Sequence, residues 1–347
     1  RQLLAEGLAY AVVGGVAALL LPGIPVTACL CLGAILGPTD AVAVSATARS
    51  VALPRRLVNI LEGESLVNDG TALTLLRVFA AAAAVGSVTV GEVSLILLES
   101  VALGLLVGAV GGWLLAILTA RARDTTVANG VILIAPFPIY ALAERVEGSG
   151  ILAVVVAALI LAHATSSTAT YAGRLQATSL WRAVIFILQA IAFFLVGIDV
   201  PSALRQLTPD EHRQLIVIVP AVLIALMLTR FAFVYGMNAI AGTRRSYRRG
   251  WIVLAWAGTR GPISALAAFT LPLTTVDGSP FPGRDMIISI TFCVVLASLL
   301  LAPTIKPLVR WCDLPPDDDH GTVQRVRVAL ARASLDRLDE MIQALRG

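Results

Sequence analysis

Charged residues are scarce in this sequence, and their scarcity excludes most classes of soluble protein. Only 14% of the 347 residues are Asp, Glu, Lys or Arg, whereas 58% are hydrophobic and the mean hydropathy is +0.87. A soluble globular domain carries about 25% charged residues. The composition therefore predicts a protein of the lipid bilayer. With a net charge of only +4, we expect no nucleic acid partner.

Cysteine and histidine are also rare, which leaves little material for a disulfide framework or a metal centre. Three of the four cysteines (Cys29, Cys31 and Cys293) lie inside apolar segments, and Cys312 lies at the end of one. We interpret them as small hydrophobic residues. The chain has only three histidines, and His163 is interpreted as an interfacial polar residue. We expect no resident cofactor.

Long apolar runs, in contrast, are abundant. A helical bilayer crossing takes about 17–25 residues, and ten crossings are predicted, at 8–21, 27–47, 57–84, 93–119, 127–143, 150–164, 181–200, 214–236, 250–271 and 286–309. The loops on one side hold eleven arginines and those on the other hold four. The positive-inside rule then places both ends of the chain in the cytoplasm. We expect an all-α, multi-pass protein of the cell membrane.

The two ends of the chain differ from the crossings. The first residue is Arg1 rather than Met, so we expect a fragment of a longer protein, and no cleavable signal peptide is predicted. After Trp311 the stretch DLPPDDDHG is a polar break. Residues 322–345 then predict one amphipathic helix in a cytoplasmic tail.

Two of the crossings contain glycine and proline near their centres. Residues 37–40 read GPTD in one, and residues 258–262 read GTRGP in the other. Proline removes a backbone donor and clashes with the preceding turn, so both helices are predicted to unwind there. Unwound backbone at membrane depth persists where it lines a cavity. Because each broken helix is the middle of a trio of opposite direction, the pattern predicts an inverted-repeat transporter.

Each break also carries a charge. Asp40 lies where a half-helix would begin, and Arg260 lies where a half-helix would end. A negative charge suits the first position and a positive charge suits the second, because helix ends carry partial charges. For Arg260 we favour this structural role. For Asp40 a structural role and a role at an ion site stay equally open.

The stretch EGESLVNDG, residues 62–70, places polar side chains inside the third crossing. Ser65, Asn68 and Asp69 share one helical face, and their oxygens are hard ligands that suit a small alkali cation. An ionisable residue inside the membrane indicates a functional site. We therefore predict that Asp69 is the working acid. A salt bridge between Asp69 and Arg77 is the competing structural interpretation.

Glu64 belongs to the same stretch but points away from that face. Its depth in the third crossing matches that of Arg230 in the crossing at 214–236. Leaving either charge buried alone would be costly, so we predict a structural ion pair between Glu64 and Arg230. Glu62 lies closer to the cytoplasmic interface and is interpreted as a surface residue.

Four separated motifs, GPTDAVAV, EGESLVNDG, LTRFAFVYG and WAGTRGPISALA, resemble in order and spacing the monovalent cation/proton antiporter-1 family, the sodium/proton exchangers. The resemblance covers essentially the whole chain. It implies a homodimer with thirteen helices per chain, of which the first three would precede this sequence. Residues 1–84 and 214–311 would form the two halves of a mobile core, 85–126 a linking helix, 127–213 the scaffold and dimerisation helices, and 312–347 the tail.

The resemblance also implies roles for single residues. Asp69 would carry the proton or the cation, Asn68 would be its amide neighbour, and Ser65 and the Thr39 carbonyl would be ligands. Asp40 would serve the first broken helix near the ion. An Asn-Asp pair resembles the electroneutral branch of the family. We therefore expect exchange of one monovalent cation, Na+ in the first instance, for one proton by alternating access.

Two functions from other classes are weighed against exchange. Asp40 and Asp69 could form the dyad of an intramembrane aspartyl protease, in which two carboxylates share a proton. That interpretation leaves Ser65, Asn68 and the second broken helix without a role. A passive cation channel would need no single titrating carboxylate. Both alternatives are less favoured by the sequence.

Overall fold

The computed structural model describes residues 2–39, 55–85, 90–122, 124–165, 171–241, 248–258, 260–312, 328–335 and 337. The named elements in these ranges are all helices, joined by short loops, and no named strand occurs in them. The prediction of an all-α fold is confirmed. Residues 328–335 of the expected tail helix are helical and exposed.

The first trio consists of α1 (Gln2–Leu20), α2 (Val26–Leu36) and α4 (Arg55–Val85), with α2 packed between its neighbours. A Cβ atom at Gly33 of α2 would collide with the backbone oxygen of Tyr10 in α1, so glycine permits the close approach of these two helices. α2 ends at Leu36, directly before the predicted break, and Gly37–Thr39 are not helical. The rest of the predicted crossing, including Asp40, lies outside the described residues.

The second trio consists of α10 (Pro209–Ala241), the pair α11 (Arg248–Trp256) and α12 (Pro262–Phe269), and α13 (Arg284–Leu301). The helix predicted at 250–271 is broken where expected, because α11 ends at Trp256 and α12 begins at Pro262. Gly261, the residue before α12, has extended backbone with φ −120° and ψ −172°. A short 3-10 turn (Ala302–Thr304) and α14 (Ile305–Cys312) follow α13.

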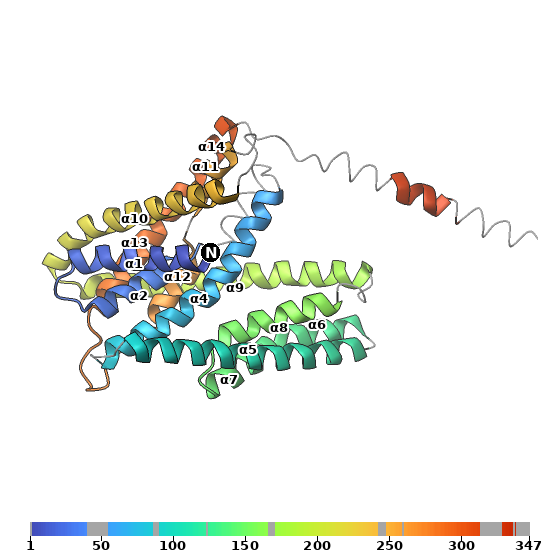
Figure 1. Ribbon diagram of the computed structural model, residues 1–347, viewed down its shortest axis with the longest axis horizontal. Coiled ribbons are helices and arrows are strands. Elements are labelled where there is room, and N and C mark those ends of the chain that lie inside the picture. The colour runs from blue at the N-terminus through green and yellow to red at the C-terminus, as the bar shows by residue number, and fades with distance from the viewer. Residues whose placement is uncertain are drawn as a thin grey trace, which may run out of the picture.

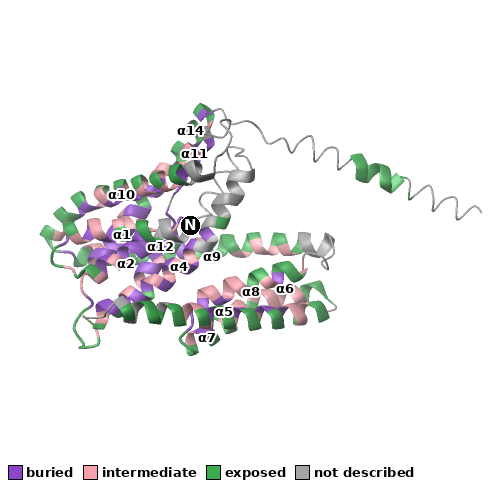
Figure 2. Ribbon diagram, viewed as in Figure 1, coloured by how far each residue is buried: buried purple, intermediate pink, exposed green. Residues whose placement is uncertain are grey.

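The two trios interlock. α1 packs on α10, α2 on α12 and α13, and α4 on α11. One continuous apolar core holds them together, with fully buried side chains from both trios, namely Leu32, Ile35, Leu36, Val222, Leu226, Ile287, Ile290 and Val294. Figure 2 shows this buried region around α1, α2, α12 and α13. The breaks of α2 and of α11–α12 are thereby brought together at the centre of the core.

The remaining helices are α5 (Val90–Arg121), α6 (Thr125–Ile134), α7 (Pro136–Arg145), α8 (Gly150–Thr165) and α9 (Tyr171–Gln206). Figure 1 shows α5 to α8 on one side of the molecule, and α4 of the first trio runs obliquely and contacts α5 and α8. The single crossing predicted at 127–143 is divided between α6 and α7, because Pro136 and Pro138 follow Ile134 and interrupt the helix. α9 packs on α12 and α13.

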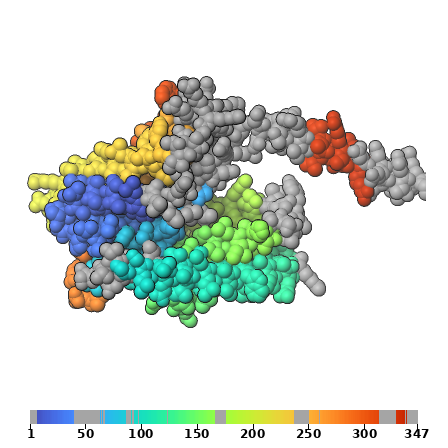
Figure 3. All heavy atoms as spheres, viewed as in Figure 1, coloured from blue at the N-terminus to red at the C-terminus, as the bar shows by residue number. Residues whose placement is uncertain are grey.

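A glycine stripe joins α5 to α8. Cβ atoms at Gly104, Gly108 and Gly112 would lie 2.8, 2.5 and 2.7 Å from backbone atoms of Ser149, Ala153 and Ala157. Small residues four apart let two membrane helices approach closely, and this contact was not predicted from the sequence. Figure 3 shows α5 and α8 side by side along one face of the molecule.

Among the described residues, five of the ten predicted crossings coincide with stretches long and apolar enough to span a bilayer: Ser94–Arg121, Thr125–Arg145, Gln176–Gln206, Pro209–Gly236 and Arg284–Cys312. Large apolar side chains such as Phe186, Leu188 and Phe194 on α9 are exposed. Exposed apolar side chains at this density are expected on helices whose outer faces contact lipid.

Candidate functional site

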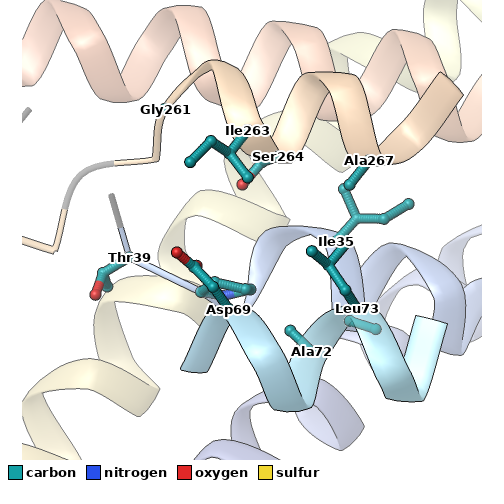
Figure 4. Close-up of a pocket in the computed structure, with 11 residues that line it drawn as sticks. Ile35, Thr39, Asp69, Ala72, Leu73, Gly261, Ile263, Ser264 and Ala267 are labelled. Carbon is teal, nitrogen blue, oxygen red and sulfur yellow. The ribbon is translucent and has the colours of Figure 1, made fainter. Parts of the chain in front are cut away.

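A small cavity lies where the end of α2, the middle of α4 and the start of α12 meet (Figure 4). Its volume is about 20 Å³, which is enough for one water-sized particle. The described lining residues are Ala34, Ile35, Pro38, Thr39, Asp69, Ala72, Leu73, Gly261, Ile263, Ser264 and Ala267. Thus both predicted breaks contribute to one cavity, together with the predicted working acid.

Asp69 supplies the carboxylate of this cavity. It lies in the middle of α4, one turn from Ala72 and Leu73, whose apolar side chains share the lining. In Figure 4 the Asp69 carboxylate extends from α4 toward the break before α12. A charged carboxylate with so much apolar surface around it is stable only when a proton, a cation or hydrogen-bond donors compensate the charge. The location is therefore suited to alternating occupancy by H+ and a small cation.

Thr39 and Ser65, the two other predicted ligands, are in contact with each other. The Ser65 hydroxyl donates a hydrogen bond of 2.7 Å to the Thr39 carbonyl oxygen, and both residues are 3% exposed. This bond ties the unwound end of α2 to α4. Thr39 lines the cavity, whereas Ser65 is not among the lining residues. Ser65 therefore reaches the cavity through the backbone of Thr39.

Among the polar residues of the stretch whose burial the structure describes, Asn68 is the most buried, at 2% exposed. Its Oδ1 atom is buried without a hydrogen-bond partner among the described residues. Its backbone carbonyl accepts a bond from the Thr71 hydroxyl at 3.0 Å. The Asn68 side chain does not line the cavity, so in this conformation it is adjacent to Asp69 in the chain only.

Arg260 connects the two breaks. Its Nε donates to the Leu36 carbonyl at 2.8 Å, its Nη2 to the Gly37 carbonyl at 3.3 Å, and its Nη1 to the Gly258 carbonyl. These carbonyls end α2 and α11, where helical acceptors lack intrahelical donors. The Arg260 backbone N–H donates to the Ser298 hydroxyl at 2.7 Å. A cation at two helix C-termini is electrostatically favourable.

Arg230 lies next to this arrangement. It is 7% exposed, and a Cβ atom at Gly258 would be 3.0 Å from Arg230 Nε and 3.3 Å from Arg260 Nη1. Glycine at position 258 therefore makes room for both guanidinium groups. The backbone of Glu64 belongs to α4, but its side chain, like that of Glu62, lies outside the described part. The ion pair of Glu64 with Arg230 stays a prediction.

Two features of the site were not predicted. Ser264, in the first turn of α12, places a hydroxyl in the cavity lining, and the only sequence signal was its position two residues after Pro262. Arg77, considered above as a partner for Asp69, instead pairs with Glu144 of α7 and donates to the Tyr140 hydroxyl at 2.6 Å. This contact joins α4 to the helices beyond the core.

Known proteins resemble this chain over most of its length. The family model for the transmembrane sodium/hydrogen exchangers matches residues 3–311. An uncharacterized Na(+)/H(+) exchanger of Mycobacterium tuberculosis is 34% identical over 329 residues, covering 90% of this chain and 60% of the relative. A sodium, potassium, lithium and rubidium/H(+) antiporter of Bacillus subtilis is 30% identical over 327 residues, covering 88% of this chain and 49% of the relative.

A solved structure has the same fold. The sodium proton antiporter MjNhaP1 from Methanocaldococcus jannaschii matches with a TM-score of 0.71 at 18% identity, covering 87% of this chain and 75% of that one. The predicted antiporter fold is thereby confirmed. The chain spans about 60% or less of the length of these two curated relatives.

Proposed function

The chain belongs to the sodium/hydrogen exchanger family, and from this premise we propose that it exchanges a monovalent cation for H+ across the membrane, with Asp69 carrying either one. The observation that carries the proposal is the cavity of about 20 Å³ that Asp69 lines between the two breaks. The chain is a multi-pass membrane protein, as its apolar helices indicate, and its family is one of transporters rather than enzymes.

The charge of Asp69 makes the two occupants alternatives. A protonated carboxyl is neutral and attracts a cation weakly, whereas the ionised carboxylate attracts one, so protonation and cation binding compete. If the core changes its accessible side only when the charge is balanced, proton and cation cross alternately. The exchange is then one cation for one proton and electroneutral, as the pairing of Asn68 with Asp69 suggests.

The proposed cation is Na+. The cavity offers oxygen ligands, which suit alkali cations, and its small volume favours a small ion. The Bacillus subtilis relative is named for sodium, potassium, lithium and rubidium, so the order of preference in this chain has to be measured. Thr39, Asp69 and Ser65 are the proposed ion-site residues, and Asp40 is proposed to balance the partial charge of the helix end at the first break. The working unit is proposed to be a homodimer in the cell membrane with a cytoplasmic tail.

The experiment is proton flux in proteoliposomes. External Na+, Li+ and K+ are added one at a time to vesicles containing the wild type, Asp69→Asn, or the control Asp199→Asn. Asp199 is exposed on α9 and does not line the cavity. We expect cation-driven proton movement in the wild type and the control, and none in Asp69→Asn. Exchange that persists in Asp69→Asn would refute the proposal.

The aspartyl protease alternative gains nothing from the structure. A protease dyad would place a second carboxylate beside Asp69, and Asp69 is the only acid among the described lining residues. Asp40, the other member of the supposed dyad, lies outside the described residues. Cation exchange is therefore the function that the site supports best.

A further inference from the structure

Ser264 is the only residue of α12 that adds a polar side chain to the described cavity lining. It is 6% exposed, and its hydroxyl has no hydrogen-bond partner among the described residues. Figure 4 shows the Ser264 oxygen on the side of α12 that faces the cavity, across from Asp69. The three polar side chains of the lining are thus Thr39, Asp69 and Ser264, one from each element that meets there.

The position of Ser264 in its helix explains why the hydroxyl lacks a partner. Some hydroxyls inside these helices bond to the carbonyl four residues earlier, as Thr74 does to Gly70 and Thr229 does to Ala225, each at 2.8 Å. Ser264 is the third residue of α12, so the residue four positions earlier, Arg260, precedes the helix. The Ser264 oxygen is not among the fully buried side-chain atoms that lack a partner, and the residue lines the cavity, so a ligand in the cavity can reach this hydroxyl.

We propose that the Ser264 hydroxyl is a ligand for the transported cation, supplied by the second broken helix opposite Asp69 and Thr39. This inference rests on the proposed exchange at Asp69. The hydroxyl oxygen would give its lone pair to the bound cation. In the proton-loaded state the same hydroxyl would exchange a hydrogen bond with the Asp69 carboxyl.

The start of α12 makes such a ligand necessary. The first backbone N–H groups of a helix lack intrahelical acceptors and carry partial positive charge. The N-terminus of α12 borders the cavity through Gly261, Ile263 and Ser264. That field favours the carboxylate of Asp69 and disfavours a cation. The Ser264 oxygen therefore gives the cation a negative contact on the side where the helix end would otherwise repel it.

The arrangement also links the ion to both halves of the core. Thr39 and Asp69 belong to the first trio, and Ser264 belongs to the second. A cation that contacts all three joins the two halves, and its size determines how closely they approach. Removal of the Ser264 hydroxyl should widen the cavity, because the small side chains of Ala72 and Ala267 do not fill the space it leaves. A wider cavity should prefer small cations less.

The test compares Ser264→Ala and Ser264→Thr with Ser289→Ala. Ser289 is a matched control, because it is 1% exposed in α13, its hydroxyl has no partner among the described residues, and it does not line the cavity. Na+, Li+ and K+ concentrations for half-maximal exchange and maximal rates are measured in proteoliposomes containing the full chain. Equilibrium binding of radioactive Na+ to the detergent-solubilised protein is measured in parallel.

We expect Ser264→Ala to weaken Na+ binding and raise the half-maximal Na+ concentration about tenfold, as for loss of one hydrogen-bonding group to a charge. The maximal rate should stay near that of the wild type, the loss should be greater for Li+ and Na+ than for K+, and Ser264→Thr should restore Na+ affinity. Ser289→Ala should match the wild type.

Unchanged Na+ affinity in Ser264→Ala would overturn the inference. So would an equal loss in Ser264→Thr, or a loss of the same size in Ser289→Ala, since both results indicate a packing effect. An Asp69→Asn arm separates this inference from the proposed function. If Asp69→Asn still exchanges, the proposed function is wrong. If Asp69→Asn is inactive and Ser264→Ala binds Na+ normally, only the role of Ser264 is wrong.

Discussion

Replacement of Arg260 by alanine should be among the most damaging single changes in the core. The Arg260 side chain donates to the carbonyls of Leu36, Gly37 and Gly258, and it is 3% exposed. Hydrogen bonds from a charged donor contribute about 1.5–3 kcal/mol each, and a buried acceptor left unpaired adds its own cost. Because the three acceptors act as a group and are not additive, we expect a loss of about 3–5 kcal/mol in the free energy of unfolding.

The measurement is thermal unfolding of purified protein in detergent, with Arg284→Ala as the control. Arg284 also donates to a helix-end carbonyl, that of Leu271, at 3.2 Å, but it makes one such bond. Its replacement should cost about 1 kcal/mol. Arg260→Lys should recover only part of the loss, because one ammonium group cannot reproduce a guanidinium that reaches carbonyls on two helices. The reasoning is refuted if Arg260→Ala unfolds at the same temperature as Arg284→Ala.

Two further predictions concern the contacts outside the ion site. Gly108→Val should destabilise the protein by about 1–3 kcal/mol, because a Cβ atom there lies 2.5 Å from the carbonyl oxygen of Ala153. Gly130→Ala on α6, where a Cβ atom meets nothing within 4 Å, should be neutral or stabilising by up to about 1 kcal/mol. Equal losses of stability in the two variants, measured by thermal unfolding, would contradict the close packing of α5 on α8. Arg77→Ala and Glu144→Ala should each cost about 1 kcal/mol, because the pair is partly exposed. A double-mutant cycle should show that the second replacement adds little, whereas additive losses would mean that the two side chains do not interact.

The features that the sequence predicted well are those that depend on local chemistry. Proline and glycine interrupt a helix whatever surrounds it, so the break between Trp256 and Pro262 could be placed within a few residues. Helical spacing placed Ser65 and Asp69 on one face of α4. The structure then brings Thr39 beside them, and Thr39 and Asp69 line the same cavity.

The features that escaped prediction depend on a partner distant in sequence. The glycines of α5 look like ordinary residues of an apolar helix until α8 is packed against them at Gly108. The sequence disfavours a pair of Arg77 with Asp69 but does not indicate its partner Glu144, which is 67 residues away. Ser264 was overlooked because a lone serine at a helix start usually has a local role. Only the meeting of α12 with α2 and α4 places its hydroxyl in the cavity.

The central claim is that one carboxyl group, that of Asp69, holds either a proton or a cation. The most direct test adds Na+ to weakly buffered, detergent-solubilised protein and records both the Na+ bound and the protons released. In the wild type, the number of protons released per Na+ bound should rise toward about one as the pH is lowered, because more of the carboxyl is then protonated before Na+ binds. Asp69→Asn should show neither Na+ binding nor proton release. Na+ binding without proton release at every pH tested, or equal release from Asp69→Asn, would contradict the claim.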